Sequence, residues 1–212
     1  MAIVPYQTAW RERFAPLFAQ DPPVALRLWA MLDGAIPGRL ATDSIAAPSY
    51  ALLQERADGT AYVGGDPAPA ALRAALRELA AVQAPVICLR PGDPLLAALP
   101  GNPGYQGEAV DWTDRSPLID LAPLAERPTG YELRRIDAEL APALAGFGYY
   151  AEMFGGLEAA LAGTVGYCLL DGAAPVSEAV AGPFARGVAE LGVGTDEGYR
   201  GRGLGLVVAA AA

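Results

Sequence analysis

Histidine and lysine are both missing from this 212-residue chain, and all 15 of its cationic side chains are arginines. The absence of histidine excludes histidine-based catalytic triads and removes the commonest metal ligand. Cysteine is scarce as well: Cys88 and Cys168 each stand alone in an apolar, strand-like run. Both are interpreted as small buried hydrophobic residues rather than as parts of a disulfide framework or a metal site. We therefore expect no bound metal.

Long apolar runs are missing too. The N-terminal stretch MAIVPYQTAWRERF has no basic flank followed by an apolar core, and no stretch approaches the ~20 apolar residues of a membrane-spanning helix. We expect neither a signal peptide nor a membrane span, and a cytoplasmic location. The formal net charge of -9 argues against a nucleic-acid partner and favours a cationic or amine ligand.

The hydrophobic patterning predicts two α/β halves, residues 1–113 and 129–212, joined by a linker, residues 114–128, that holds three prolines. In the first half we expect helices at 8–20, 23–32 and 69–83 and strands at 38–44, 49–56, 60–65 and 84–90. In the second half we expect strands at 130–136, 163–170, 175–184 and 188–195, and helices at 137–147, at 149–162 and from 204. The common order has two explanations: a tandem duplication, or the general similarity of alternating α/β domains.

The most informative stretch is GVGTDEGYRGRGLGLVVAAAA, residues 192–212. A strand, a glycine-rich turn and a helix start together form an anion site, because the first N–H groups of a helix have no partner within the helix. Arg200 and Arg202 can add charge-assisted hydrogen bonds, although solvated loop arginines are the alternative. A dinucleotide-binding loop needs its last glycine where this chain has Leu206, and a P-loop needs a lysine, which the chain lacks. Both kinds of phosphate-binding loop are therefore disfavoured.

The pattern that fits is Arg-x-x-Gly-x-Gly, residues 200–205. Together with the hairpin and strand before it, this stretch resembles the acyl-CoA-binding motif of the GNAT superfamily of N-acetyltransferases. The resemblance covers roughly residues 129–212 and is greatest to the subgroup with the zwittermicin-resistance acetyltransferases. It implies an α/β (α+β) fold with a mixed, mostly antiparallel sheet flanked by helices. The preceding α/β domain would be a degenerate GNAT-like repeat if the halves are duplicated.

The resemblance also implies a reaction: direct transfer of an acetyl group from acetyl-CoA to a primary amine of a small molecule. The backbone of Val193, Gly194 and Thr195 would bind the pantetheine arm. The amides of the following turn would hold the pyrophosphate; they belong to Arg200, Gly201, Arg202, Gly203, Leu204 and Gly205.

Three residues are candidates for handling the amine proton: Glu190 on the strand at 188–195, and Ser177 and Glu178 on the strand before it. For each, an ordinary solvent-facing strand residue is the alternative. Tyr149 and Tyr150 begin the helix that lines the acceptor groove in this family, with simple packing as the alternative. In the first half, Asp66 is predicted to cap the corresponding helix, and no arginine precedes it.

The sequence stops at Ala212, about two turns into the last helix, whereas a GNAT domain continues with further strands and a helix, so we expect additional residues. The competing function is a non-catalytic acyl-CoA-binding or protein-interaction module derived from the same fold. A homodimer is compatible with either function. A dinucleotide-binding protein is a third alternative, which Leu206 argues against.

Overall fold

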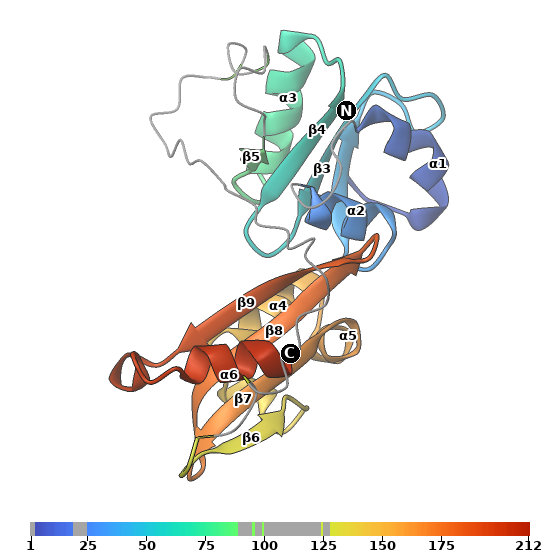
Figure 1. Cartoon of the computed structure of the whole chain (residues 1–212). Coiled ribbons are helices and arrows are strands. Elements are labelled where there is room, and N and C mark those ends of the chain that lie inside the picture. The colour runs from blue at the N-terminus through green and yellow to red at the C-terminus, as the bar shows by residue number, and fades with distance from the viewer. Residues whose placement is uncertain (1–2, 19–24, 89–94, 96–98, 100–123, 125–127) are drawn as a thin grey trace. The chain divides into compact units, whose positions relative to one another are not determined.

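The computed structural model describes residues 3–18, 25–88, 95, 99, 124 and 128–212. These residues form two compact units, within Met1–Trp112 and Thr113–Ala212 (Figure 1). The predicted linker at 114–128 lies almost entirely outside the described residues.

The first unit is built on a five-stranded sheet in the order β1-β2-β3-β4-β5. Neighbouring strands are antiparallel except for the parallel pair β4 and β5. The strands are β1 (Val4–Pro5), β2 (Gly38–Thr42), β3 (Tyr50–Glu55), β4 (Thr60–Gly65) and β5 (Val86–Cys88). The helices are α1 (Arg11–Phe14), flanked by 3₁₀ turns at Thr8–Trp10 and Ala15–Leu17, α2 (Leu26–Leu32) and α3 (Pro69–Ala80).

Helix α3 covers one face of this sheet because its apolar residues recur at helical spacing. Leu72, Ala75 and Leu79 are fully buried and pack with Tyr50 and Leu52 of β3. Pro69 begins the helix, where a missing N–H costs no hydrogen bond. The order strand, helix, parallel strand follows from this packing, since a parallel neighbour requires a crossover connection.

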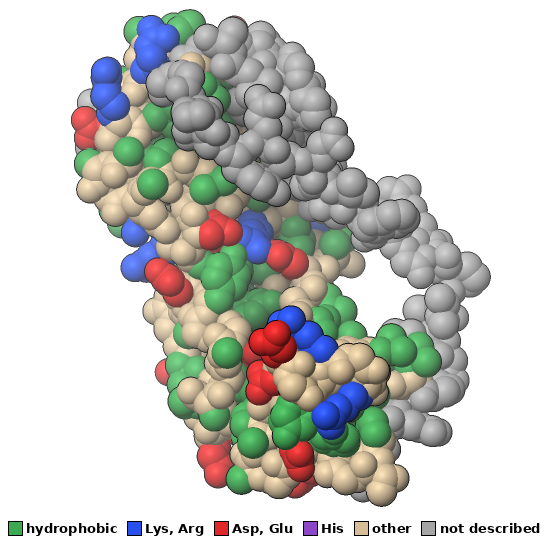
Figure 2. Space-filling model, turned by 90° about the vertical axis from the view of Figure 1, so that its left-hand side faces the viewer, with side chains coloured by type: hydrophobic (Ala, Val, Ile, Leu, Met, Phe, Trp, Pro, Cys, Tyr) green, Lys and Arg blue, Asp and Glu red, His purple; other side chains and the backbone are tan. Residues whose placement is uncertain are grey.

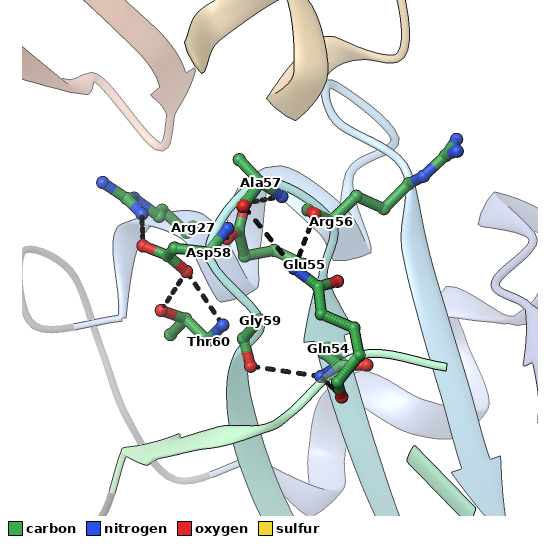
Figure 3. A network of polar contacts seen from close by, with 9 residues as sticks. Arg27, Gln54, Glu55, Arg56, Ala57, Asp58, Gly59 and Thr60 are labelled. Atoms are coloured by element: carbon green, nitrogen blue, oxygen red, sulfur yellow. Dashed lines mark hydrogen bonds and ion pairs between the residues drawn. The ribbon is translucent and has the colours of Figure 1, made fainter. Parts of the chain in front are cut away.

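The β3–β4 turn is held by a network of polar groups that runs from the buried Glu55 to the exposed Asp58 (Figure 3). The carboxylate of Asp58 accepts hydrogen bonds from the Arg27 guanidinium at 2.9 Å and from the Thr60 N–H at 2.8 Å. Glu55 is fully buried and accepts the Asp58 N–H at 2.7 Å. Burial, assisted by the neighbouring Asp58 carboxyl, raises the pKa of Glu55 to about 7. Although burial opposes it, hydrogen bonds from Glu55 and Thr60 lower the pKa of Asp58.

The second unit is built on a four-stranded antiparallel sheet in the order β6-β7-β8-β9. Its strands are β6 (Glu132–Arg135), β7 (Val165–Asp171), β8 (Ala174–Ala185) and β9 (Val188–Thr195). Its helices are α4 (Phe147–Phe154), α5 (Leu157–Gly163) and α6 (Leu204–Ala211), with 3₁₀ turns at Ala141–Ala143 and Glu197–Tyr199.

The two faces of the second sheet carry different helices: α6 lies on one face, and α4 and α5 lie on the other (Figure 1). On the α6 face, Leu204, Val207 and Val208 pack against Leu169 of β7 and Ala179 of β8. The side chains of a strand alternate between the faces. Each residue of β8 and β9 therefore faces either α6 or α4, and this divides the candidate site residues into two groups.

Three predicted helices differ from the observed ones. The segment 137–147 contains only the 3₁₀ turn Ala141–Ala143 before α4 begins at Phe147. The Asp137 carboxylate accepts the N–H groups of Glu139 and Leu140 as an N-cap would, but the backbone is extended at Leu144, so no helix continues from it. The helix predicted at 149–162 is split by Gly155 and Gly156, whose φ angles are 83° and 158°. The helix predicted at 8–20 is reduced to α1 and its flanking 3₁₀ turns.

Candidate functional site

The junction between β9 and α6 is a tight turn that depends on glycine. Gly201 and Gly203 both have a φ of 76°, a left-handed conformation that residues with a Cβ rarely adopt. Gly203 occupies the N-cap position of α6, and no side chain caps this helix. The N–H groups of Leu204 and Gly205 lie in the first turn and have no partner within the helix.

The space beside this turn is open. A Cβ built on Gly201 or Gly203 would meet no other atom within 4 Å, and both glycines are exposed. Helix α6 adds a partial positive charge at this end, because its peptide dipoles sum along the axis. The turn therefore has the geometry and the charge to bind an anion at its backbone.

The two arginines of the turn are held in place by different contacts. The Arg200 Nε–H donates to the Thr195 carbonyl at 3.1 Å. The Arg202 guanidinium lies 5.0 Å from the ring centroid of Tyr199 and donates to the Tyr131 hydroxyl at 3.2 Å and to the Gly198 carbonyl at 2.9 Å. A guanidinium has five N–H groups, so both arginines keep donors for a further acceptor.

Strand β9 is the last strand of its sheet, so one edge of its backbone pairs with no strand of the described chain. Val193 is 50% exposed, and Gly194 is exposed beside it. Val193 and Thr195 face α6: a Cβ built on Gly205 would lie 3.4 Å from Val193 Cγ1 and 3.3 Å from Thr195 Oγ1. The predicted pantetheine-binding residues thus lie next to the start of α6.

Ser177 belongs to the α6 face as well. Its Oγ lies 2.8 Å from Thr195 Oγ1 and donates to the Gly194 carbonyl at 3.1 Å. The residue is 4% exposed, so its hydroxyl is engaged within the strand pair. Ser177 and Glu178 are neighbours in sequence, but their side chains lie on opposite faces of the sheet.

Glu178 lies on the α4 face, opposite Gly194 in the β8–β9 register. Its Oε1 accepts the N–H of Gly146, the N-cap residue of α4, at 2.8 Å. Its Oε2 is buried and has no hydrogen-bond partner among the described residues. Burial raises the pKa of Glu178; the Gly146 N–H opposes this rise, and the charge of Asp196 adds to it.

The other candidates on the α4 face are Tyr149 and Tyr150, which belong to α4, and Glu190, which belongs to β9. The Tyr150 hydroxyl donates to the Val180 carbonyl at 3.3 Å and lies against Gly192. Tyr149 packs edge-on against Tyr150. Glu190 is half-buried, four residues before Gly194, which corresponds to a separation of about 13 Å along a strand.

One face of the molecule carries both signs of charge (Figure 2). Figure 2 shows one face of the molecule, on which acidic and basic side chains lie close together among apolar ones. Within the described ranges, no three Cys, Asp or Glu side chains gather as a metal site would require. Over the same ranges, every helix is too short or too polar to cross a membrane.

Several residues that shape the site carry no local sequence signal. Gly146 contacts Glu178 from 32 positions away, and Tyr131 contacts Arg202 from 71 positions away. Tyr199 supports Arg202, and its hydroxyl donates to the Asp171 carboxylate at 2.9 Å. Only the fold brings these residues together, so local patterns could not identify them.

Comparison with known proteins identifies the unit that contains this site. Residues 113–212 match the family model for GNAT acetyltransferases. No curated protein matches the chain.

Among solved structures, a GCN5-related N-acetyltransferase-like protein from Streptococcus suis is similar over 97% of this chain and 83% of its own, at 21% identity and a TM-score of 0.67. A GCN5-related N-acetyltransferase from Kribbella flavida matches over 77% of this chain and 70% of its own, at 21% identity and a TM-score of 0.43. The first similarity confirms the predicted fold class, a mixed and mostly antiparallel α/β fold flanked by helices. The second unit of this chain, with its glycine turn between β9 and α6, belongs to the GNAT acetyltransferase family.

Proposed function

We propose that the second unit transfers an acetyl group from acetyl-CoA directly to a primary amine of a small molecule. The observation that carries this proposal is the β9–α6 junction. Its two left-handed glycines leave open space beside the unpaired N–H groups of a helix start, and two arginines flank them. This arrangement suits a pyrophosphate, which needs several N–H donors and positive charge at close range.

In this proposal, the backbone of the turn binds the pyrophosphate, and Arg200 and Arg202 direct their remaining N–H groups to its oxygens. The free edge of β9 at Val193, Gly194 and Thr195 supplies backbone groups for the amide-containing pantetheine arm. The thioester would then lie along β9. A β9 backbone N–H would stabilise the oxyanion that forms when the amine attacks the carbonyl carbon.

The cofactor part of this proposal is tested by titrating acetyl-CoA into the chain in a calorimeter. Arg200→Glu should weaken binding by at least about tenfold, because it removes a charge-assisted hydrogen bond and introduces repulsion. Arg135→Glu is the matched control: Arg135 is exposed on β6 of the same unit and undergoes the same charge change. Equal affinities for all three proteins would show that the glycine turn does not bind acetyl-CoA.

The acceptor part is tested by measuring release of the CoA thiol in the presence of a panel of amines: putrescine, spermidine, tyramine and glycinamide. We expect turnover with at least one of them, with a preference for cationic acceptors because the chain carries a net charge of -9. Binding of acetyl-CoA without turnover of any amine would favour the alternative, a non-catalytic acyl-CoA-binding module.

A further inference from the structure

One carboxylate oxygen in the second unit is buried but unused. Glu178 Oε1 is bonded to the Gly146 N–H at 2.8 Å, whereas Oε2 is shielded from solvent and pairs with no described group. Buried polar atoms in native proteins are nearly always hydrogen-bonded, so an exception calls for an explanation. A carboxylate can only accept hydrogen bonds, and its missing partner is therefore an N–H or O–H donor.

Two glycines lie next to the Glu178 carboxylate, and a Cβ on Gly146 would lie 3.6 Å from the unpartnered Oε2. A Cβ on Gly146 would lie 2.9 Å from Glu178 Oε1, closer than real Cβ contacts allow. A Cβ on Gly194, the register partner of Glu178, would lie 3.6 Å from the same oxygen. Gly146 and Gly194 are both exposed, so the surface next to the buried carboxylate is backbone that carries no side chain at these two residues.

The first unit provides an internal comparison for this position. There the sequence Val63-Gly64-Gly65-Asp66 corresponds to Val193-Gly194-Thr195-Asp196 at the end of the third antiparallel strand. Gly64 pairs with Ala51, as Gly194 pairs with Glu178.

The corresponding place in the first unit is closed by apolar groups. Ala51 is fully buried, and a Cβ on Gly64 would lie 2.7 Å from Phe18 Cδ1. The same strand position is thus sealed by a phenyl ring in one unit and occupied by an exposed glycine beside a carboxylate in the other. The Glu178 carboxylate thus has no counterpart at this strand position in the first unit.

The other acidic and hydroxyl candidates are less well placed. Ser177 faces α6, and its hydroxyl is engaged with Thr195 and Gly194. Glu190 lies about 13 Å along β9 from Gly194, the residue opposite Glu178. Gly192, which the Tyr150 hydroxyl contacts, lies between Glu190 and Gly194 on this strand. The two glutamates cannot act on the same atom.

We propose that Glu178 binds the acceptor amine and takes its proton. The deprotonated Oε2 accepts a hydrogen bond from the substrate ammonium and removes one proton. The neutral nitrogen then attacks the thioester carbonyl, so that a C–N bond forms and the C–S bond breaks. The nitrogen loses its second proton as CoA leaves as a thiol, and Glu178 returns its proton to solvent. This assignment rests on the proposed acetyl transfer.

The groups around Glu178 suit this role. Asp196 adds negative charge, and Cys168, its buried register partner on β7, has a thiol whose pKa burial raises to about 11, so it stays neutral. Gly146 contributes a neutral N–H. Arg134, the register partner of Cys168 on β6, adds a cation to this row, and the Asp137 carboxylate pairs with it at 3.4 Å. Burial and the charge of Asp196 thus keep the Glu178 carboxylate basic and suited to a cationic amine.

The test compares Glu178→Gln with the wild-type chain, using the panel amine with the highest turnover. Glutamine keeps an oxygen for the Gly146 N–H but cannot accept the amine proton. We expect kcat to fall by about 100- to 10,000-fold, the usual contribution of general-base catalysis, and the acidic limb of the kcat/KM–pH profile to disappear. The Kd for acetyl-CoA and the melting temperature should stay unchanged. Glu132→Gln, the same change at an exposed position of β6, should match the wild type.

Each contrary result has a separate meaning. If Glu178→Gln retains the wild-type kcat and acidic limb, or if Glu190→Gln alone removes that limb, the assignment is wrong while the acetyltransferase function stands. If kcat falls only together with the melting temperature and the acidic limb persists, Glu178 is a structural residue and the assignment is again wrong. If the wild-type chain binds no acetyl-CoA, the proposed function fails first. If it binds acetyl-CoA but acetylates no panel amine, the acceptor class and the assignment are both contradicted.

Discussion

The two units of this chain share an order of elements as far as the helix after the third antiparallel strand, but the loop before that helix differs in length. Each runs from an edge strand through short helices and three antiparallel strands into a helix. Asp66 and Asp196 end the corresponding strands, but α3 begins three residues after Asp66, whereas α6 begins eight residues after Asp196. The five extra residues in the second unit, Tyr199–Gly203, include both arginines and both left-handed glycines. The glycine turn with its two arginines thus follows the third antiparallel strand in the second unit and not in the first.

The comparison also explains why the first unit shows no such site at the corresponding place. Helix α3 begins at Pro69 with Ala68 as its N-cap, and no side chain caps it. The prediction that Asp66 caps this helix is therefore wrong. Phe18 covers Gly64, so the strand end is closed. The shared topology favours tandem duplication, which stays a prediction, as does the resemblance to the zwittermicin-resistance subgroup.

The largest effect on stability is expected from introducing a glutamate into the first unit at Ala51, the position that corresponds to Glu178 of the second unit. Ala51→Glu should destabilise the first unit by about 3–5 kcal/mol at pH 8, the cost of an uncompensated buried charge. Glu178→Ala should cost only about 1 kcal/mol, because it removes one hydrogen bond. All three tryptophans lie within residues 1–112, so tryptophan fluorescence during urea unfolding reports on the first unit, and circular dichroism reports on both. A mild effect of Ala51→Glu would contradict the view that this position is sealed.

The second largest effect is expected from giving the second unit the shorter loop of the first. Deleting Tyr199–Gly203 should abolish acetyl-CoA binding. It should also remove the stabilisation of roughly 2.7 kcal/mol that a ligand gives at 100 times its Kd. Thermal unfolding with and without acetyl-CoA measures this loss. The first unit is the built-in control, since its fluorescence transition should not move. Retained ligand stabilisation would show that the site lies elsewhere.

An intermediate effect is expected at the buried carboxyl of the first unit. Because the folded pKa of Glu55, about 7, lies above its ordinary value of 4.5, its contribution to stability is fully present below pH 4.5 and is lost as the pH rises through 7. The first unit should melt at a lower temperature at pH 8 than at pH 5. Glu55→Gln should reduce this difference and stabilise the unit at pH 8 by about 1–3 kcal/mol. A variant with an undiminished pH dependence would assign the titration to another group.

The smallest effect is expected from a single methyl group beside Glu178. Gly146→Ala should displace the carboxylate by a few tenths of an ångström and lower kcat/KM by about tenfold, because small misplacements of a catalytic group are costly. Gly148→Ala is the matched control: a Cβ there meets nothing within 4 Å. Acetyl-CoA affinity should be equal in both variants. Equal turnover would indicate that the position of Glu178 is not critical.

Local sequence patterns correctly predict the positions of most strands and of α3. Asp58-Gly59 and Asp171-Gly172 mark hairpin turns, and Gly59 and Gly172 have the positive φ angles that such turns require. The break between α4 and α5 was missed although Gly155-Gly156 is visible in the sequence, because single glycines are tolerated in helices and the apolar pattern continues across them.

The site was harder to predict because it depends on which face each strand residue occupies. Alternation places Ser177 and Glu178 on opposite faces, but only the observed register shows that Glu178 is the one beside α4. The glycine turn could be found because its residues are contiguous. The support of Arg202 by Tyr131 and Tyr199 could not, since it joins the two ends of the second unit.

This support of Arg202 has a consequence for affinity. Its guanidinium is already stacked on Tyr199 and anchored to Tyr131 and Gly198. A bound phosphate would therefore not have to freeze a mobile side chain, and little conformational entropy would be lost on association. Lysine would carry the same charge but neither the planar stack nor the two simultaneous anchors. Preorganisation, rather than charge alone, is what this arginine contributes to the turn.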